Sequence, residues 1–315
     1  MKINRKIQYI GLAIIGGLAL IGLIIGTFLD QQITAKVGDV NNMFGIMFTA
    51  LGPVLSLSVG SLAGAMLFFM PKHEKQWVNI TCKTLGAVAF IGFTFFSVKE
   101  GFAYVDFPRM EAGASTYKAL IAVLIGLIDL SIIIFTNLYT KKLDEKFIIR
   151  TVLIIFAIIA AWFFVSEVTK YLASRPRPRV LDANPEIGFR AWYEFHPFQA
   201  FKDPYKDCKS FVSGHAFNSA CLITVLPLIF SMGKKENNEA VQITALIVGG
   251  LWAFIVGLSR IIARAHFMSD VMGGILLSAG AQALIIFVAD KILNKHEQIV
   301  PNEKNSREIR LFFYF

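Results

Sequence analysis

The sequence predicts an all-α fold, a polytopic membrane bundle of about eight transmembrane helices. Hydrophobic residues make up 55% of the 315 residues, and the mean hydropathy is +0.59. Apolar runs of about 20 residues recur along the chain, and each can cross a hydrocarbon core of roughly 30 Å as a helix. Basic residues gather in alternate connections between these runs, as they do on the cytoplasmic side of membrane proteins.

The apolar runs set the predicted spans. We expect them at 8–29, 50–70, 78–98, 118–139, 147–170, 213–232, 240–259 and 267–290. The first run ends at Asp30 without the small residues of a signal-peptide cleavage site, which favours a retained anchor. Gly52 and Pro53 interrupt the pattern, so residues 40–52 are predicted to form a short interfacial helix, separate from the second span.

The spans divide the chain into three regions. Residues 1–146 hold about four helices, residues 147–290 hold four more with a long outer loop at 171–212, and residues 291–315 form a cytoplasmic tail. No long polar stretch other than this loop and this tail remains outside the spans. A separate soluble domain is therefore not expected.

The distribution of basic residues predicts that both termini are cytoplasmic. The segments expected inside contain Lys2, Arg5, Lys6, Lys72, Lys75, Lys141, Lys142, Lys146, Arg150, Lys234 and Lys235. The outer loops 30–42 and 99–117 contain only Lys36, Lys99 and Arg109. Residues 170–209 break the rule, because they are rich in Arg and Lys on the outer side. An anionic ligand is the simplest reason.

Other classes of function have little support. The net charge of +9 follows from the membrane topology, and no basic patch is interleaved with exposed aromatic residues, so nucleic acid is not a predicted partner. The three cysteines, Cys82, Cys208 and Cys221, have no metal-binding spacing and do not indicate a disulfide framework.

Three polar clusters fall at the outer ends of the last four spans. The first closes the fifth span, where Pro176 and Pro178 should end the helix. Lys170 then lies on its last turn and Arg177 just beyond it, and both cations suit phosphate oxygens. The alternative is a basic patch whose side chains extend to lipid headgroups.

The second cluster, Ser213-Gly214-His215, opens the sixth span. A helix start offers backbone N–H groups to an anion, and glycine lets the backbone approach closely. Ser213 can cap the helix or donate to a phosphate oxygen. The alternative is an ordinary Ser-Gly helix start with an interfacial histidine.

The third cluster connects the last two spans and contains Ser259, Arg260, Arg264, His266 and Asp270. If the last span is helical from about residue 266, His266 and Asp270 are neighbours on one face. The carboxylate can then accept a hydrogen bond from one ring nitrogen and make the other nitrogen more basic. A structural His–Asp pair is the alternative, although it would not require two further cations.

Together the clusters resemble the three signature motifs of the type 2 phosphatidic acid phosphatase superfamily. The motif K-x6-R-P runs from Lys170 to Pro178, Ser-Gly-His occupies 213–215, and S-R-x5-H-x3-D runs from Ser259 to Asp270. The family's proline before Ser-Gly-His is Val212 here, a change at the helix entry that removes no catalytic group. The resemblance covers roughly 147–290, which would then be the catalytic core.

The resemblance implies a phosphohistidine mechanism without a metal or cofactor. His266 would attack phosphorus, Asp270 would hold it, and His215 would protonate the leaving oxygen. The phosphoryl oxygens would be bound by Lys170, Arg177, Ser213, Gly214 and Arg260. These roles agree with phosphoryl transfer as positioning plus charge stabilisation.

The resulting prediction is a lipid phosphate or diphosphate phosphatase of the plasma membrane whose site faces outward. Undecaprenyl diphosphate, phosphatidylglycerophosphate and phosphatidate are the expected substrates. A lipid phosphotransferase with the same site is one alternative, and a non-catalytic anion-binding or transport protein is another.

Overall fold

The computed structural model describes residues 4–103, 114–232 and 238–299, and every regular element in these ranges is helical. Within them, eight helical segments are long and apolar enough to cross a membrane, which confirms the predicted fold class. The elements that form these segments are α1 (Arg5–Val37), α2 (Met43–Phe68), α3 (Gln76–Ala103), α4 (Ala114–Tyr139), α5 (Glu145–Ala173), α7 (Gly214–Ser219) with α8 (Leu222–Ser231), α9 (Glu239–Ile262) and α10 (Met268–Ile299). A short helix, α6 (Pro178–Ala183), follows α5.

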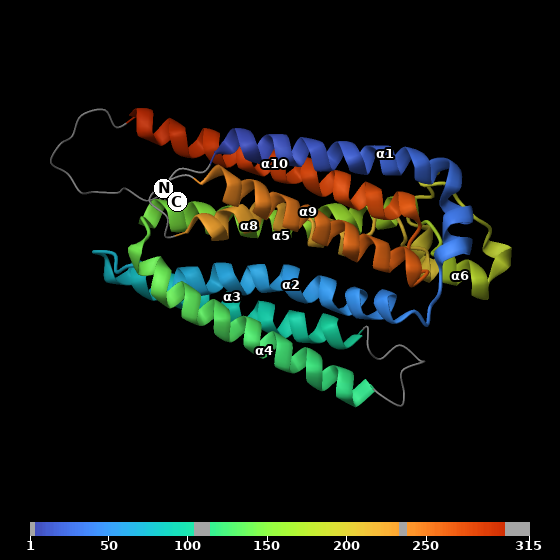
Figure 1. The fold of residues 1–315 in the computed structure, drawn as a ribbon, viewed down its shortest axis with the longest axis horizontal. Helices are drawn as coiled ribbons and strands as arrows, with labels where there is room; N and C mark the ends of the chain where they lie inside the picture. Colours follow the sequence, from blue (N-terminus) through green and yellow to red (C-terminus); the bar gives the residue numbers. More distant parts are fainter. Residues whose placement is uncertain (1–3, 104–113, 233–237, 300–315) are drawn as a thin grey trace.

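The helices form one elongated bundle (Figure 1). Helix α1 lies along α10, α2 packs against α3 and α4, and α5, α8 and α9 lie between these groups. One apolar core joins α2, α5 and α8, and another joins α1, α9 and α10. Large apolar side chains on α3 face outward, with Val88 65%, Ile91 67% and Phe95 63% exposed. Such a surface suits lipid rather than water, so the bundle indicates a multi-pass membrane protein.

Helix α2 differs from the sequence prediction. The structure has one helix through Gly52 and Pro53, and the separate interfacial helix at 40–52 was wrong. Proline has no N–H, so Pro53 leaves the carbonyl of Thr49, four residues earlier, without its usual helical donor. His215 hydrogen-bonds to the backbone of Thr49. This side chain from another helix supplies the missing donor and compensates for the proline.

The sixth span is a single run in the sequence but two helices in the structure, with a break at Ala220 and Cys221. The buried side chain of Gln282 on α10 donates to the Ala220 carbonyl at 3.0 Å. Gly249 brings α9 against the same place, because a Cβ there would lie 2.7 Å from the Ile223 nitrogen. The break is therefore satisfied by neighbouring helices and does not expose backbone to lipid.

The long loop after α5 lies at one end of the bundle, beside the last turns of α1 and α9 and the start of α10 (Figure 1). Several residues used in the topology prediction lie outside the described ranges: Lys2, Arg109, Lys234, Lys235 and the tail from 300 to 315.

Candidate active site

The end of α5 brings the first cluster next to the second. The helix ends at Ala173, where Ser174 adopts the left-handed conformation and donates its N–H to the Lys170 carbonyl at 2.9 Å. Lys170 lies on the last turn, as predicted, and its ammonium is ion-paired with Glu167 at 2.6 Å. A Cβ added to Gly214 would lie 3.3 Å from the Lys170 Nζ. Glycine at this position therefore lets the ammonium approach the Ser-Gly-His backbone.

The start of α7 brings the second cluster next to the third. The Ser213 N–H donates to the Asp270 carbonyl at 2.9 Å, and the Trp162 indole donates to the Gly214 carbonyl at 3.0 Å. Ser213 is the N-cap of α7, but its side chain makes no capping hydrogen bond. Its buried hydroxyl has no hydrogen-bond partner among the described residues. Of the two roles open to Ser213, donation to a ligand fits this geometry better than capping.

His266 is 2% exposed and lies just before α10, which begins at Met268 rather than at the histidine. Its Nδ1 is 2.8 Å from the Ser210 carbonyl. A carbonyl can only accept, so Nδ1 carries the proton and Nε2 carries the lone pair. Burial lowers the pKa of His266 well below its ordinary value of 6.5, and the positive charges of Arg260 and Arg177 lower it further. The ring is therefore neutral at neutral pH, as a nucleophile must be.

Asp270 is fully buried and acts on His266 less directly than the sequence suggested. Its Oδ2 lies 3.9 Å from Nδ1, too far for the hydrogen bond that we expected. That oxygen instead accepts from the Ser210 hydroxyl at 2.6 Å and from the Phe267 N–H at 2.8 Å. Ser210 thus contacts both groups, with its hydroxyl on the carboxylate and its carbonyl on the imidazole.

The basic residues of the three clusters divide into two groups. The charges of Arg260, Arg177 and Lys170 all act on His266, and Arg177 has a buried Nε without a hydrogen-bond partner among the described residues. Arg264 is directed elsewhere: its guanidinium pairs with Asp182 of α6 at 2.6 Å and donates to the Thr34 carbonyl. Three cations therefore act electrostatically on the imidazole, whereas Arg264 links α6 and α1 to the loop before α10.

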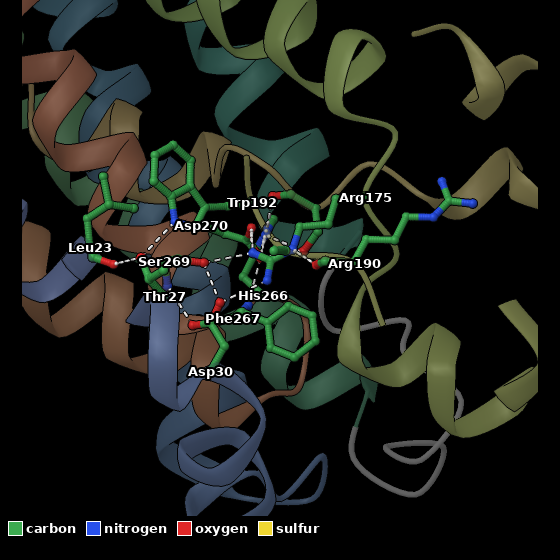
Figure 2. Close-up of polar contacts among 12 residues, drawn as sticks. Leu23, Thr27, Asp30, Arg175, Arg190, Trp192, His266, Phe267, Ser269 and Asp270 are labelled. Carbon is green, nitrogen blue, oxygen red and sulfur yellow. Dashed lines mark hydrogen bonds and ion pairs between the residues drawn. The ribbon is translucent and has the colours of Figure 1, made fainter. Parts of the chain in front are cut away.

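The site also involves residues that the sequence did not single out. Arg175 is fully buried and ion-paired with Asp270, and it also binds Asp30 at the end of α1 (Figure 2). Thr49 of α2 contacts His215. The only signal for Asp30 was its position as the last residue of an apolar run, and nothing in the sequence linked α1 or α2 to the clusters.

Comparison with known proteins points to the same part of the chain. Residues 151–292 match the model of the PAP2 superfamily, a segment that contains all three clusters. Phosphatidylglycerophosphatase B of Bacillus subtilis (strain 168) is 34% identical over 68 residues, which span 22% of this chain and 33% of that protein. No solved structure matches the chain.

The PAP2 segment begins within α5, so α1 to α4 lie outside it. Two of those helices nevertheless reach the clusters, α1 through Asp30 and α2 through Thr49. Chemically, the three clusters offer a neutral imidazole, a second, half-buried imidazole, three cations and two buried donors, of Ser213 and Arg177, that have no hydrogen-bond partner among the described residues. This set can hold a phosphoryl group and move it to a nitrogen.

Proposed function

We propose that the chain is a membrane lipid phosphatase that works through a phosphohistidine on His266. The observation that carries the proposal is the state of this ring. It is buried, its Nδ1 proton is held by the Ser210 carbonyl, and the charges of three cations act on it. A structural histidine would not need three cations, whereas a nucleophile that attacks a phosphate dianion does.

The proposed reaction has two steps. Nε2 of His266 attacks phosphorus, the bond from phosphorus to the lipid oxygen breaks, and His215, which enters the step protonated on both ring nitrogens, gives that oxygen its Nε2 proton. Water then attacks the phosphohistidine, His215 takes a proton from it, and inorganic phosphate leaves with His266 restored. Lys170, Arg177 and Arg260 balance the charge on the phosphoryl oxygens in both steps.

The buried donors of Ser213 and Arg177 support a bound phosphoryl group, because unsatisfied buried donors are costly unless a ligand accepts from them. Gly214 lets the phosphate approach the backbone. The protein's own donors thus replace a metal ion in this proposal.

A lipid substrate follows from the location of the site at one end of eight membrane-length helices. The name of the Bacillus subtilis relative supports phosphatidylglycerophosphate, and phosphatidate and undecaprenyl diphosphate present the same terminal phosphate. We propose that the substrate is one of these three and that the site faces outward from the plasma membrane.

The test is phosphate release from a panel of these lipids by the purified full chain in detergent. The wild type should release inorganic phosphate, and His266→Ala should not. His73→Ala is the control, because His73 lies between α2 and α3, away from the clusters. A protein that releases no phosphate from any lipid but phosphorylates an acceptor lipid would be a phosphotransferase instead.

Trapping the intermediate tests the mechanism separately. Brief reaction with a lipid labelled on its terminal phosphate should leave label on the wild type, and the bond should be labile in acid and stable in base, as for a phosphoramidate. His215→Ala should retain some label because it removes the leaving-group proton and not the nucleophile. Label on His266→Ala would contradict the assignment.

A further inference from the structure

A buried ion pair connects α1 to the carboxylate beside the proposed nucleophile. Arg175 lies between two aspartates, with Nη2 2.8 Å from Asp30 and Nη1 2.6 Å from Asp270. Arg175 and Asp270 are fully buried, and Asp30 is 3% exposed. The rings of Phe267 and Phe189 flank the guanidinium, with their centroids 4.5 and 5.3 Å from its central carbon. The charges are therefore shielded from water, and each depends on the others.

The start of α10 is held by the same aspartate. Asp30 accepts the Ser269 N–H at 2.9 Å and also accepts from the Ser269 hydroxyl, which in turn receives a bond from Arg175 at 2.7 Å (Figure 2). Ser269 precedes Asp270 directly. Asp30 thus fixes both the guanidinium that binds Asp270 and the backbone that carries it.

Gly26 makes this approach of α1 to α10 possible. A Cβ at this position would lie 2.7 Å from the Ser269 nitrogen and 3.0 Å from the Asp30 Oδ1. Any larger residue would push α1 away from Ser269, because the nearest atom belongs to backbone that cannot move aside alone. The close contact and the ion pair are independent features of one attachment.

Two further contacts connect this ion pair to the proposed nucleophile, His266. One carboxylate oxygen of Asp270 accepts from Arg175, and the other accepts from the Ser210 hydroxyl. The Ser210 carbonyl in turn accepts from the His266 ring. A change in the orientation of the carboxylate would therefore move Ser210 and turn the imidazole.

We infer that Asp30 and Arg175 are positioning residues that orient His266 for attack on phosphorus. Helix α1, outside the PAP2 segment, is then part of the catalytic unit. The inference rests on the proposed function. It requires that Asp30 affect the chemical step and leave substrate binding unchanged, because Asp30 contacts none of the proposed phosphate ligands in the described structure.

The first test compares Asp30→Asn with Asp290→Asn. Asn keeps the shape of Asp30 but removes its charge, so kcat should fall about 10- to 100-fold, as for other supporting partners of a reacting ligand. KM should stay within about twofold, because binding and chemistry separate in this way when only the transition state is affected. Asp290 pairs with Arg5 at the other end of the same helix pair, at 3.1 Å, so Asp290→Asn should leave kcat unchanged.

The second test needs no change of charge. Gly26→Ala should lower kcat and the rate of phosphoenzyme formation together. Gly17→Ala should change neither, since a Cβ there meets nothing within 4 Å. This pair keeps the inference testable if Asp30→Asn does not fold.

The outcomes separate the two proposals. A wild type without phosphatase activity overturns the proposed function. An active wild type with Asp30→Asn or Gly26→Ala at full kcat overturns the positioning role. Asp290 also pairs with Arg150 of α5, so equal losses in Asp30→Asn and Asp290→Asn would show that loss of any ion pair between helices lowers kcat, which also overturns it.

Discussion

Each of the two imidazoles of the candidate site is hydrogen-bonded to backbone. The His266 Nδ1 donates to the Ser210 carbonyl at 2.8 Å, and His215 bonds to the backbone of Thr49. A carbonyl acceptor fixes both the tautomer and the orientation of an imidazole. The two rings are thus set by a loop and a helix that are far from them in the sequence, and their reacting atoms need little reorganisation.

The lowered pKa of His266 predicts the pH dependence of the chemical step. A histidine whose pKa is lowered stays neutral above that pKa, so the acidic decline of phosphoenzyme formation, which reports protonation of His266, should lie below pH 6.5. Rapid-quench measurement of the labelled phosphoenzyme gives this profile. A decline centred above pH 6.5 would contradict a neutral buried ring.

The same profile in Arg260→Gln separates the imidazole from the substrate, whose phosphate also titrates. The charge of Arg260 opposes protonation of His266, so its removal should move the acidic decline to higher pH. At low lipid concentration the second-order rate constant reports the free lipid, whose titration is the same with both proteins. Identical profiles would assign the decline to the lipid phosphate.

Substitution of Arg177 by lysine tests whether this position needs only a positive charge or also the planar guanidinium. Its buried Nε has no partner among the described residues, which suits a guanidinium that donates two parallel bonds to a phosphate. Arg177→Lys keeps the charge but loses the paired donors, and kcat/KM should fall on the order of 100-fold, as when one stabilising donor is removed. Steady-state kinetics measure this. Near-normal activity in the lysine variant would show that charge alone is needed at this position.

The positions of the three motifs at helix ends could be predicted because each motif is short and its spacing fits one helix end. Asp30 and Arg175 could not. They are 145 positions apart, and their pairing depends on how α1 packs against α10. The direct His266–Asp270 bond was expected from helical spacing, and it fails because α10 begins two residues after the histidine.

At the scale of elements, α2 contains a proline that weakens the helix, and the carbonyl that this proline leaves free binds His215 of the candidate site. Proline inside a helix costs about 3 kcal/mol or more, since it removes a hydrogen bond and crowds the preceding turn. Pro53→Ala should therefore raise the thermal unfolding midpoint in detergent. The restored N–H can also bond the Thr49 carbonyl and compete with His215, so kcat should fall roughly tenfold, the lower end for loss of a supporting partner.

Pro227, inside α8, provides the matched control. It lies on a helix that contributes no residue to the candidate site. Pro227→Ala should raise the unfolding midpoint in the same way and leave kcat unchanged. If Pro53→Ala gains stability with full activity, the Thr49 carbonyl does not position His215.

The membrane spans could be predicted from the sequence, but the details within two of the helices could not. Lipid exposure requires long apolar runs, so the spans were predictable from composition alone. Gly52-Pro53 was misread because a side chain from α7 satisfies the freed carbonyl, which no local pattern can reveal. The break at Ala220 also had no local signal, since Gln282 of α10 completes its hydrogen bonding.

At the scale of the whole molecule, the structure accounts for much of the basic loop that broke the charge rule. Several of its cations are neutralised locally: Lys170 by Glu167, Arg175 by Asp30 and Asp270, and Lys206 by Asp203. Arg190 donates to the Ser174 carbonyl at 3.0 Å. Arg177 is among the cations that act on His266. These ion pairs offset part of the positive charge of the loop, and we still expect the loop to lie outside.

Labelling with a membrane-impermeant maleimide tests this orientation. Lys202 is an exposed residue of the loop, and Lys72 is an exposed residue in the connection between α2 and α3, at the other end of the bundle. In intact cells Lys202→Cys should be labelled, and Lys72→Cys should be labelled only after permeabilisation. The unaltered chain gives the background, because Cys208 and Cys221 are buried and Cys82 is half-buried. Labelling of Lys72→Cys alone in intact cells would place the candidate site on the cytoplasmic side, where only a substrate of the inner leaflet could reach His266.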